Sequence, residues 1–245
     1  MTFREHLVPL LTNVGIDVSQ TTMDKFEELG SALLADPLYK SVSKIFEPAD
    51  IAVKHFFDAL LPLALPPAPW NNLTKKGRIL DLGTGGGFPA LPLALWFPVR
   101  PVFAIDAKGK SIDFVARMAA HLHIKNLEAV QGRAEEIGRL PAFREAIDLV
   151  VCRAVADVRV LVELCMPLVK VGGFLLLYKG PSLDEELLAA RQAFHKLAID
   201  DADLSVHRFE PPLVPFARGF VLIEKRRPTP DIYPRRNGVP SAQPL

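Results

Sequence analysis

The stretch ILDLGTGGGFP, Ile79–Pro89, decides the fold of this 245-residue chain. An apolar run ends in Asp81, and Gly83, Gly85 and Gly87 follow at alternate positions before a segment of helical character. Glycines let the backbone turn tightly and let a ligand approach the main chain without a Cβ in the way. A helix that begins there presents free N–H groups to a polar ligand. The pattern indicates a strand–loop–helix unit that binds a nucleotide-like molecule.

Short apolar runs continue beyond this stretch and alternate with helical segments, which predicts βαβ crossovers and a parallel sheet with both faces covered. The expected fold is therefore α/β, a doubly wound, mostly parallel, seven-stranded, Rossmann-like sheet. The expected strands are Arg78–Leu82, Pro101–Asp106, Leu127–Gln131, Ile147–Cys152, Gly172–Lys179, Leu204–Phe209 and Gly219–Lys225. The expected helices between and after them are Pro89–Trp96, Gly109–Leu122, Val158–Val169 and Leu183–Leu197.

The first third of the chain has helical character. Met23, Phe26, Leu29 and Leu33 recur at intervals of three or four residues, which is helical spacing. A second helix is expected over Pro48–Leu63, with proline in its first turn. The turn-rich run PPAPWNN then marks a seam. We expect an N-terminal helical region at 1–70, the α/β domain at 71–228, and a basic, Pro/Arg-rich tail without regular period at 229–245.

The composition is that of a soluble globular protein. The hydrophobic share is 49% and the formal net charge is +1, so any nucleic-acid binding must come from a local patch rather than the whole molecule. Cys152 and Cys165 both lie in apolar runs, which favours reduced core thiols and a cytoplasmic location. The apolar stretch Gly85–Val99 is broken by prolines and is too short to cross a bilayer. A monomer without membrane contact is expected.

The identity of the nucleotide-like ligand follows from the acidic residues. Asp106 ends the next expected strand, about twenty residues after the loop, where a carboxylate can accept hydrogen bonds from ribose hydroxyls. A dinucleotide enzyme would show G-x-G-x-x-G, but Phe88 occupies the third glycine position. Asp81 would repel a phosphate and attract the amino group and sulfonium of S-adenosylmethionine. The sequence favours a class I S-adenosylmethionine-dependent methyltransferase over another nucleotide-binding enzyme or a structural glycine turn.

Two further segments qualify this prediction. Ala134 and Glu135 follow the third expected strand, where adenine would lie; the alternative is a solvated loop with Glu136 on the surface. The fourth expected strand ends in CRAVA, without the Asn/Asp-Pro-Pro-aromatic motif that is usual in enzymes methylating exocyclic amines. Cys152 and Cys165 do not stand in the context of a nucleophilic cysteine. Methylation of exocyclic amines and of cytosine C5 is therefore disfavoured.

Several runs, in this order, resemble the bacterial small-subunit rRNA methyltransferase G family, also called the glucose-inhibited division protein B family. They are VKHFFDALLPL, DLGTGGGFPALPLA, IDAKGKSIDFV, QGRAEEIG, CRAVADVRVLVELCMPLVKVGGFLLLYKG and YPRRNGVPSAQPL. The resemblance covers roughly residues 51–245. In the N-terminal part the chain departs from the family pattern at Ser41, Val42, Phe46 and Ala59.

The resemblance implies methylation of guanine N7 in 16S rRNA, with S-adenosylmethionine as cofactor and 16S rRNA or the small ribosomal subunit as partner. It also implies cofactor contacts at Gly83, Phe88, Ala134, Glu135 and Arg153. N7 has a lone pair and no proton to lose, so the reaction needs positioning rather than a general base. We accordingly expect no catalytic acid or base.

The remaining candidates concern positioning, metal and RNA. Arg153 and Lys179, at the ends of two strands, are candidate positioning residues, with a structural ion pair as the alternative for Arg153. His121 and His123 are two residues apart and would face differently on a helix, so no metal site is expected. A local basic patch for RNA is expected from Lys108, Lys110, Arg226, Arg227, Arg235 and Arg236. The alternatives are a small-molecule methyltransferase and a non-catalytic RNA-binding protein that has kept the fold.

Overall fold

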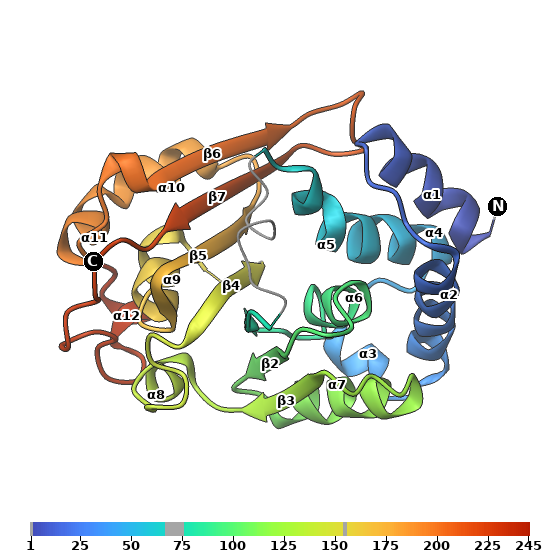
Figure 1. Ribbon diagram of the computed structural model, residues 1–245, viewed down its shortest axis with the longest axis horizontal. Helices are drawn as coiled ribbons and strands as arrows, with labels where there is room; N and C mark the ends of the chain where they lie inside the picture. Colours follow the sequence, from blue (N-terminus) through green and yellow to red (C-terminus); the bar gives the residue numbers. More distant parts are fainter. Residues whose placement is uncertain (1, 67–75, 154–155) are drawn as a thin grey trace.

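The computed structural model describes residues 2–66, 76–153 and 156–245 (Figure 1). At its centre is a seven-stranded sheet in the order β3-β2-β1-β4-β5-β7-β6. Strands β1 to β5 are parallel, whereas β7 runs antiparallel to both β5 and β6. The strands are β1 (Ile79–Leu82), β2 (Val102–Asp106), β3 (Leu127–Gln131), β4 (Ile147–Arg153), β5 (Val169–Lys179), β6 (Leu204–Phe209) and β7 (Arg218–Glu224). The predicted α/β fold is confirmed, and all seven expected runs form strands.

Helices cover both faces of this sheet. Before β1 lie α1 (Phe3–Asn13), α2 (Gln20–Ala35), α3 (Tyr39–Val42), α4 (Pro48–Asp50), the π-helix η1 (Ile51–Phe57), α5 (Asp58–Leu60) and the 3₁₀-helix η2 (Leu61–Ala64). Between and after the strands lie α6 (Ala90–Trp96), α7 (Gly109–His121), α8 (Ala134–Ile137), α9 (Val158–Cys165), α10 (Leu183–Ala189), α11 (Arg191–Lys196), the 3₁₀-helix η4 (Asp201–Asp203) and α12 (Val239–Ala242).

The central strands β1 and β4 are buried on both sides because their apolar residues are largely consecutive rather than alternating. On β4, Leu149 and Val151 belong to the core formed with α2, α6 and α7, while Val150 and Cys152 belong to the core formed with α9 and α11. Successive side chains of a strand point to opposite faces, so an unbroken apolar run supplies both cores. Figure 1 shows the N-terminal helices on one side of the sheet and α9 to α12 on the other.

The N-terminal helices are more extensive than expected. Helix α1 begins with a capping box in which the Thr2 hydroxyl accepts from the Glu5 N–H and the Glu5 carboxylate accepts from the Thr2 N–H. That T-x-x-E pattern is the signal that could have found α1. The helix expected over Pro48–Leu63 is present as the succession α4, η1, α5 and η2. Its π-helical turn differs from the expected regular α-helix, and such turns are frequent at functional sites.

Several details differ from the expectation or lie outside the described residues. The single helix expected over Leu183–Leu197 is present as two helices, α10 and α11. Val169 begins β5 and does not end a helix, since α9 stops at Cys165. The segment at 229–245, expected without regular structure, contains α12. The expected boundary between residues 70 and 71 falls outside the described residues. Among the residues that are described, no helix has the length and apolar character needed to cross a membrane.

Candidate functional site

A cleft opens at the carboxyl ends of β1, β2 and β3, which is where open α/β sheets bind ligands. Its volume is about 390 Å³, within the range of roughly 300–1,000 Å³ typical of small-molecule sites. The lining residues come from the glycine loop, the β2–α7 and β3–α8 connections and α9. They are Leu82, Gly83, Gly85, Ile105, Asp106, Ala107, Lys108, Gly132, Ala134 and Leu164.

The glycine loop has a backbone that only glycine adopts easily. Gly83, Gly85 and Gly87 have φ values of +77°, +54° and +86°. A Cβ on Gly87 would lie 2.4 Å from Leu91 Cδ1, so this glycine also permits the close packing of α6. A Cβ on Gly85 would meet no atom of the described chain within 4 Å and would project into open space. The loop therefore leaves room for a ligand beside its main chain, as the expected cofactor requires.

Asp106 ties the two sides of the cleft together. Its Oδ2 accepts a hydrogen bond from the Gly85 N–H at 2.9 Å, and its Oδ1 accepts one from the Lys108 N–H, also at 2.9 Å. The carboxylate thus fixes the glycine loop and the start of α7 with one side chain. Each oxygen retains a further lone pair, so Asp106 can hold ribose hydroxyls while it holds the loop.

Asp81 lies beneath the loop and is fully buried. Its Oδ2 accepts from the Ala90 N–H at 3.1 Å, whereas Oδ1 is buried without a well-placed hydrogen-bond partner in the described chain. Burial raises the pKa of Asp81 to about 6, and the nearby Thr84 hydroxyl opposes this shift. A buried carboxylate with an unused acceptor suits a cationic group such as the amino group of S-adenosylmethionine.

Ala134 and Glu135 begin α8, at the far side of the cleft. Ala134 lines the cleft, while the buried Glu135 carboxylate turns to the Gly238 N–H, which donates to Oε1 at 2.8 Å. Glu136 is exposed and accepts from Asn237 Nδ2 at 2.6 Å. The structure therefore brings Ala134 to the cleft beside Gly83, Gly85 and Asp106, but it sets Glu135 behind the wall.

Arg153 and Lys179 stand at the ends of β4 and β5, and both are paired inside the fold. Arg153 Nη1 donates to Asp58 Oδ2 at 2.9 Å and to the Lys54 carbonyl at 3.0 Å. Its guanidinium carbon lies 5.9 Å from the centre of the Phe88 ring. Lys179 Nζ donates to the Ala156 carbonyl at 2.8 Å and pairs with Glu186 at 2.5 Å. The ion-pair alternative for Arg153 is thus present, and its place beside Phe88 keeps it next to the glycine loop.

Asp58 is a site residue that the sequence did not single out. The fully buried Asp58 also accepts a hydrogen bond from Arg218 Nε at 2.6 Å. One carboxylate therefore faces two guanidinium groups, Arg153 and Arg218, and the cluster keeps one positive charge in excess. Positive charge at the carboxyl edge of the sheet suits an anionic partner such as a carboxylate or a phosphate.

His55 was also not a predicted site residue, yet it links the N-terminal helices to the glycine loop. Its ring stacks on Phe88 at 4.2 Å between centroids, with 9° between the planes. Its Nε2 lies 3.1 Å from the Tyr39 hydroxyl and 3.2 Å from the Ser43 hydroxyl. Burial, with the nearby charge of Arg153, lowers the pKa of His55 to about 3, so the ring is neutral at physiological pH. No periodicity in the sequence could reveal this contact.

The six residues expected to bind RNA do not form one patch. Lys108, Lys110 and Arg236 are exposed and make no ion pair in the described part of the chain. Arg226 and Arg227 follow β7, whose last residue Glu224 pairs with Phe174 in the middle of β5, where the pairing of these two strands begins. They therefore lie toward the amino ends of the parallel strands, at the end of the sheet opposite the cleft. Each of them pairs with acidic residues: Arg226 with Glu224 and Asp203, and Arg227 with Asp200 and Asp203.

Arg235 differs from its neighbour Arg236 in the same segment. Its guanidinium pairs with Glu163 of α9, whose side chain is 0% exposed. This pairing departs from the solvent-facing tail arginine that the sequence suggested, because a buried carboxylate on an apolar helix requires a cation.

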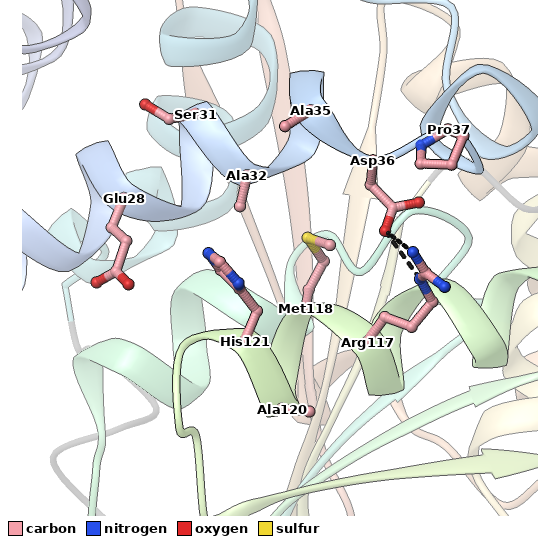
Figure 2. Close-up of a pocket in the computed structure, with 10 residues that line it drawn as sticks. All are labelled: Glu28, Ser31, Ala32, Ala35, Asp36, Pro37, Arg117, Met118, Ala120 and His121. Carbon is pink, nitrogen blue, oxygen red and sulfur yellow. Dashed lines mark hydrogen bonds and ion pairs between the residues drawn. The ribbon is translucent and has the colours of Figure 1, made fainter.

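A second cavity, of about 790 Å³, lies between α2 and α7 and away from the cleft (Figure 2). Asp36 and Arg117 close one end with an ion pair of 2.8 Å, and small residues such as Ala32 and Ala120 form its walls. His121 lines this cavity, and His123 lies beyond the end of α7. Over the described ranges, no three His, Cys, Asp or Glu side chains gather as metal ligands. Both cysteines are buried and unbridged, which confirms their expected place in the core.

Comparison with known proteins relates the chain to one family of methyltransferases. A family model described as rRNA small subunit methyltransferase G matches residues 39–211. The chain is 40% identical over 233 residues to the ribosomal RNA small subunit methyltransferase G of Deinococcus radiodurans, covering 95% of this chain and 89% of that protein. It is 35% identical over 241 residues to the protein of the same name from Bacillus thuringiensis, covering 98% of each.

Solved structures resemble the chain in fold. The cofactor-bound crystal structure of Rv0187 from MTB aligns with a TM-score of 0.56 and 18% sequence identity, covering 90% of this chain and 96% of that one. At this identity the likeness shows a shared fold.

Proposed function

Because the chain belongs to the rRNA small subunit methyltransferase G family, we propose that it transfers a methyl group from S-adenosylmethionine to N7 of a guanine in 16S rRNA. The structural observation that supports this most is the cleft at the end of β1, with Asp81 buried beneath the glycine loop and Asp106 at its rim. A carboxylate under the loop favours a cationic cofactor over a dinucleotide pyrophosphate.

When bound, S-adenosylmethionine supplies an electrophilic methyl group on a sulfonium. The protein's residues would bind and orient it: Asp81 would hold the amino group, Asp106 the ribose and Ala134 the adenine. Phe88, held by His55 and Arg153, borders the loop on the substrate side. Since N7 carries a free lone pair, these residues need only align the reactants and exclude water. Neither His55, with its lowered pKa, nor Cys152, whose pKa is raised by Cys165 and by burial, is suited to act as a general base.

The proposal is tested by transfer of labelled methyl from S-adenosylmethionine to rRNA, followed by chain cleavage at 7-methylguanine. Naked 16S rRNA and assembled small subunits serve as the two substrates, and a small-molecule methyl acceptor is the comparison. Label at a single cleavage site in 16S rRNA supports the proposal. Label that remains in small molecules, or no transfer despite cofactor binding, would refute it in favour of the alternatives.

The rate of methyl transfer at saturating cofactor and RNA should be nearly constant between about pH 6.5 and about pH 8.5. The pKa of His55 is about 3 and that of Asp81 is about 6, so His55 stays neutral and Asp81 is mostly ionised throughout this window. Single-turnover rates across the window measure this directly. The Cys152→Ser protein, if folded, should show the same flat profile. A rate that rises tenfold per pH unit would reveal a base that the structure does not suggest.

RNA binding should depend on the exposed basic residues that make no ion pair in the described part of the chain. Replacing Lys110 and Arg236 with alanine should weaken RNA binding and make the slope of log K against log salt shallower by about one unit per lost phosphate contact. The matched variant replaces Arg226 and Arg227, which are ion-paired at the opposite sheet edge, and should leave the slope unchanged. Salt titrations of RNA affinity compare the two. A larger loss of RNA affinity in the Arg226/Arg227 variant would show that RNA binds at the end of the sheet opposite the cleft.

A further inference from the structure

The C-terminal segment, residues 229–245, is joined to α9 by an ion pair between the partly exposed Arg235 and the buried Glu163. The Arg235 N–H and Nε both donate to Glu163 Oε1, at 2.9 and 2.8 Å, and Nη2 donates to Oε2 at 2.6 Å. Glu163 is fully buried on a helix whose other buried residues are apolar. Charge-assisted, two-pronged pairs of this kind hold geometry well, and a buried carboxylate without its cation is costly.

The same segment is fastened to α8. The Gly238 N–H donates to the buried Glu135 Oε1 at 2.8 Å, and Asn237 Nδ2 donates to Glu136 Oε1 at 2.6 Å. Gly238 has a φ of +82°, a conformation that favours glycine and turns its N–H toward α8. Glu135 and Gly238 are 103 residues apart in sequence, so α8 and the segment are held together by tertiary contacts rather than by chain proximity.

Both attachment points stand directly behind the cofactor cleft. Glu163 precedes Leu164, and Glu135 follows Ala134; Leu164 and Ala134 line the cleft. The segment therefore joins the two elements that form the adenine side, α8 and α9, from the rear. Helix α8 is a single turn of four residues, too short to keep its position by its own hydrogen bonds.

We propose that Arg235 and Gly238 are positioning residues of the cofactor site: through Glu163 and Glu135 they hold α9 and α8 so that Leu164 and Ala134 fit the adenine. This rests on the proposed function insofar as the ligand is S-adenosylmethionine. The segment is then part of the cofactor site, although it touches the cleft only through its partners.

The test measures binding of S-adenosylhomocysteine by calorimetry, and then KM and kcat with rRNA. Arg235→Ala should raise the dissociation constant and the KM for S-adenosylmethionine about tenfold, because α9 loses its ion pair with the segment that also holds α8. The kcat at saturating cofactor should stay within about twofold of the wild-type value. Arg235→Lys retains the charge and should recover part of the affinity. Arg191→Ala, on an exposed arginine of α11 without a partner in the described chain, is the matched control and should bind as wild type does.

If Arg235→Ala does not fold, Glu163→Gln carries the test, since it keeps the shape of the side chain and removes its charge. It should weaken cofactor binding in the same direction, by a smaller factor. Unchanged affinity in the folded variants, or a lower kcat with unchanged KM, overturns the inference. Failure of the wild-type protein itself to bind S-adenosylhomocysteine would instead count against the proposed function, so the two failures are distinguishable.

Discussion

Replacing Asp58 with alanine should lower the free energy of unfolding by about 3–5 kcal/mol. The Asp58 side chain is 1% exposed and faces the guanidinium groups of Arg153 and Arg218, which are 15% and 23% exposed. Removing the carboxylate leaves two like charges close together without their shared counter-charge. Because water still reaches part of each guanidinium, we expect the lower end of that range. Denaturant titration with an unchanged m-value measures the loss.

Asp50→Ala is the matched control for Asp58→Ala. Asp50 pairs with Lys54 one helical turn away, at 2.9 Å, but both side chains are about half exposed. Exposed pairs of this kind contribute roughly 0–1 kcal/mol. Similar small losses in the free energy of unfolding of the two variants would show that the Asp58 cluster is solvated and that its carboxylate does not stabilise the fold. A large loss restricted to Asp58→Ala would confirm that this buried carboxylate balances the charge of Arg153 and Arg218.

Replacing Asp106 with alanine should weaken cofactor binding by about 1–3 kcal/mol. The variant loses the expected ribose acceptor, and it also releases the Gly85 and Lys108 N–H groups that the carboxylate holds. Because both effects weaken the same cleft, we expect the loss of cofactor-binding free energy to lie toward the upper end of that range. Calorimetric titration with S-adenosylmethionine and S-adenosylhomocysteine should show similar losses for both, since they share the ribose.

Asp113→Ala, on the exposed side of α7, removes an equal charge without touching the cleft and should bind the cofactor as wild type does. Asp106→Asn keeps an acceptor oxygen and should recover part of the affinity. Equal affinity of wild type and Asp106→Ala would remove Asp106 from the cofactor site.

The sequence by itself determined the features that depend on neighbouring residues. The apolar runs of β1, β4 and β7 are visible because a strand buried on both faces needs consecutive apolar side chains. The glycine loop is visible because positive φ and close approach require glycine at particular positions. Asp106 follows from its fixed distance along a βαβ unit. Even helix α1 had a local signal, the capping box of Thr2 and Glu5.

Only the tertiary structure decided which charged residues meet. The pair Arg235–Glu163 joins positions 72 apart, and Asp58 joins Arg153 and Arg218 across 95 and 160 residues. An arginine in a basic run has the same local pattern whether it faces RNA or a buried carboxylate. The antiparallel direction of β7, which sends Arg226 and Arg227 to the edge opposite the cleft, is likewise not encoded in spacing. Electrostatic pairing depends on distance in space, and folding alone sets that distance.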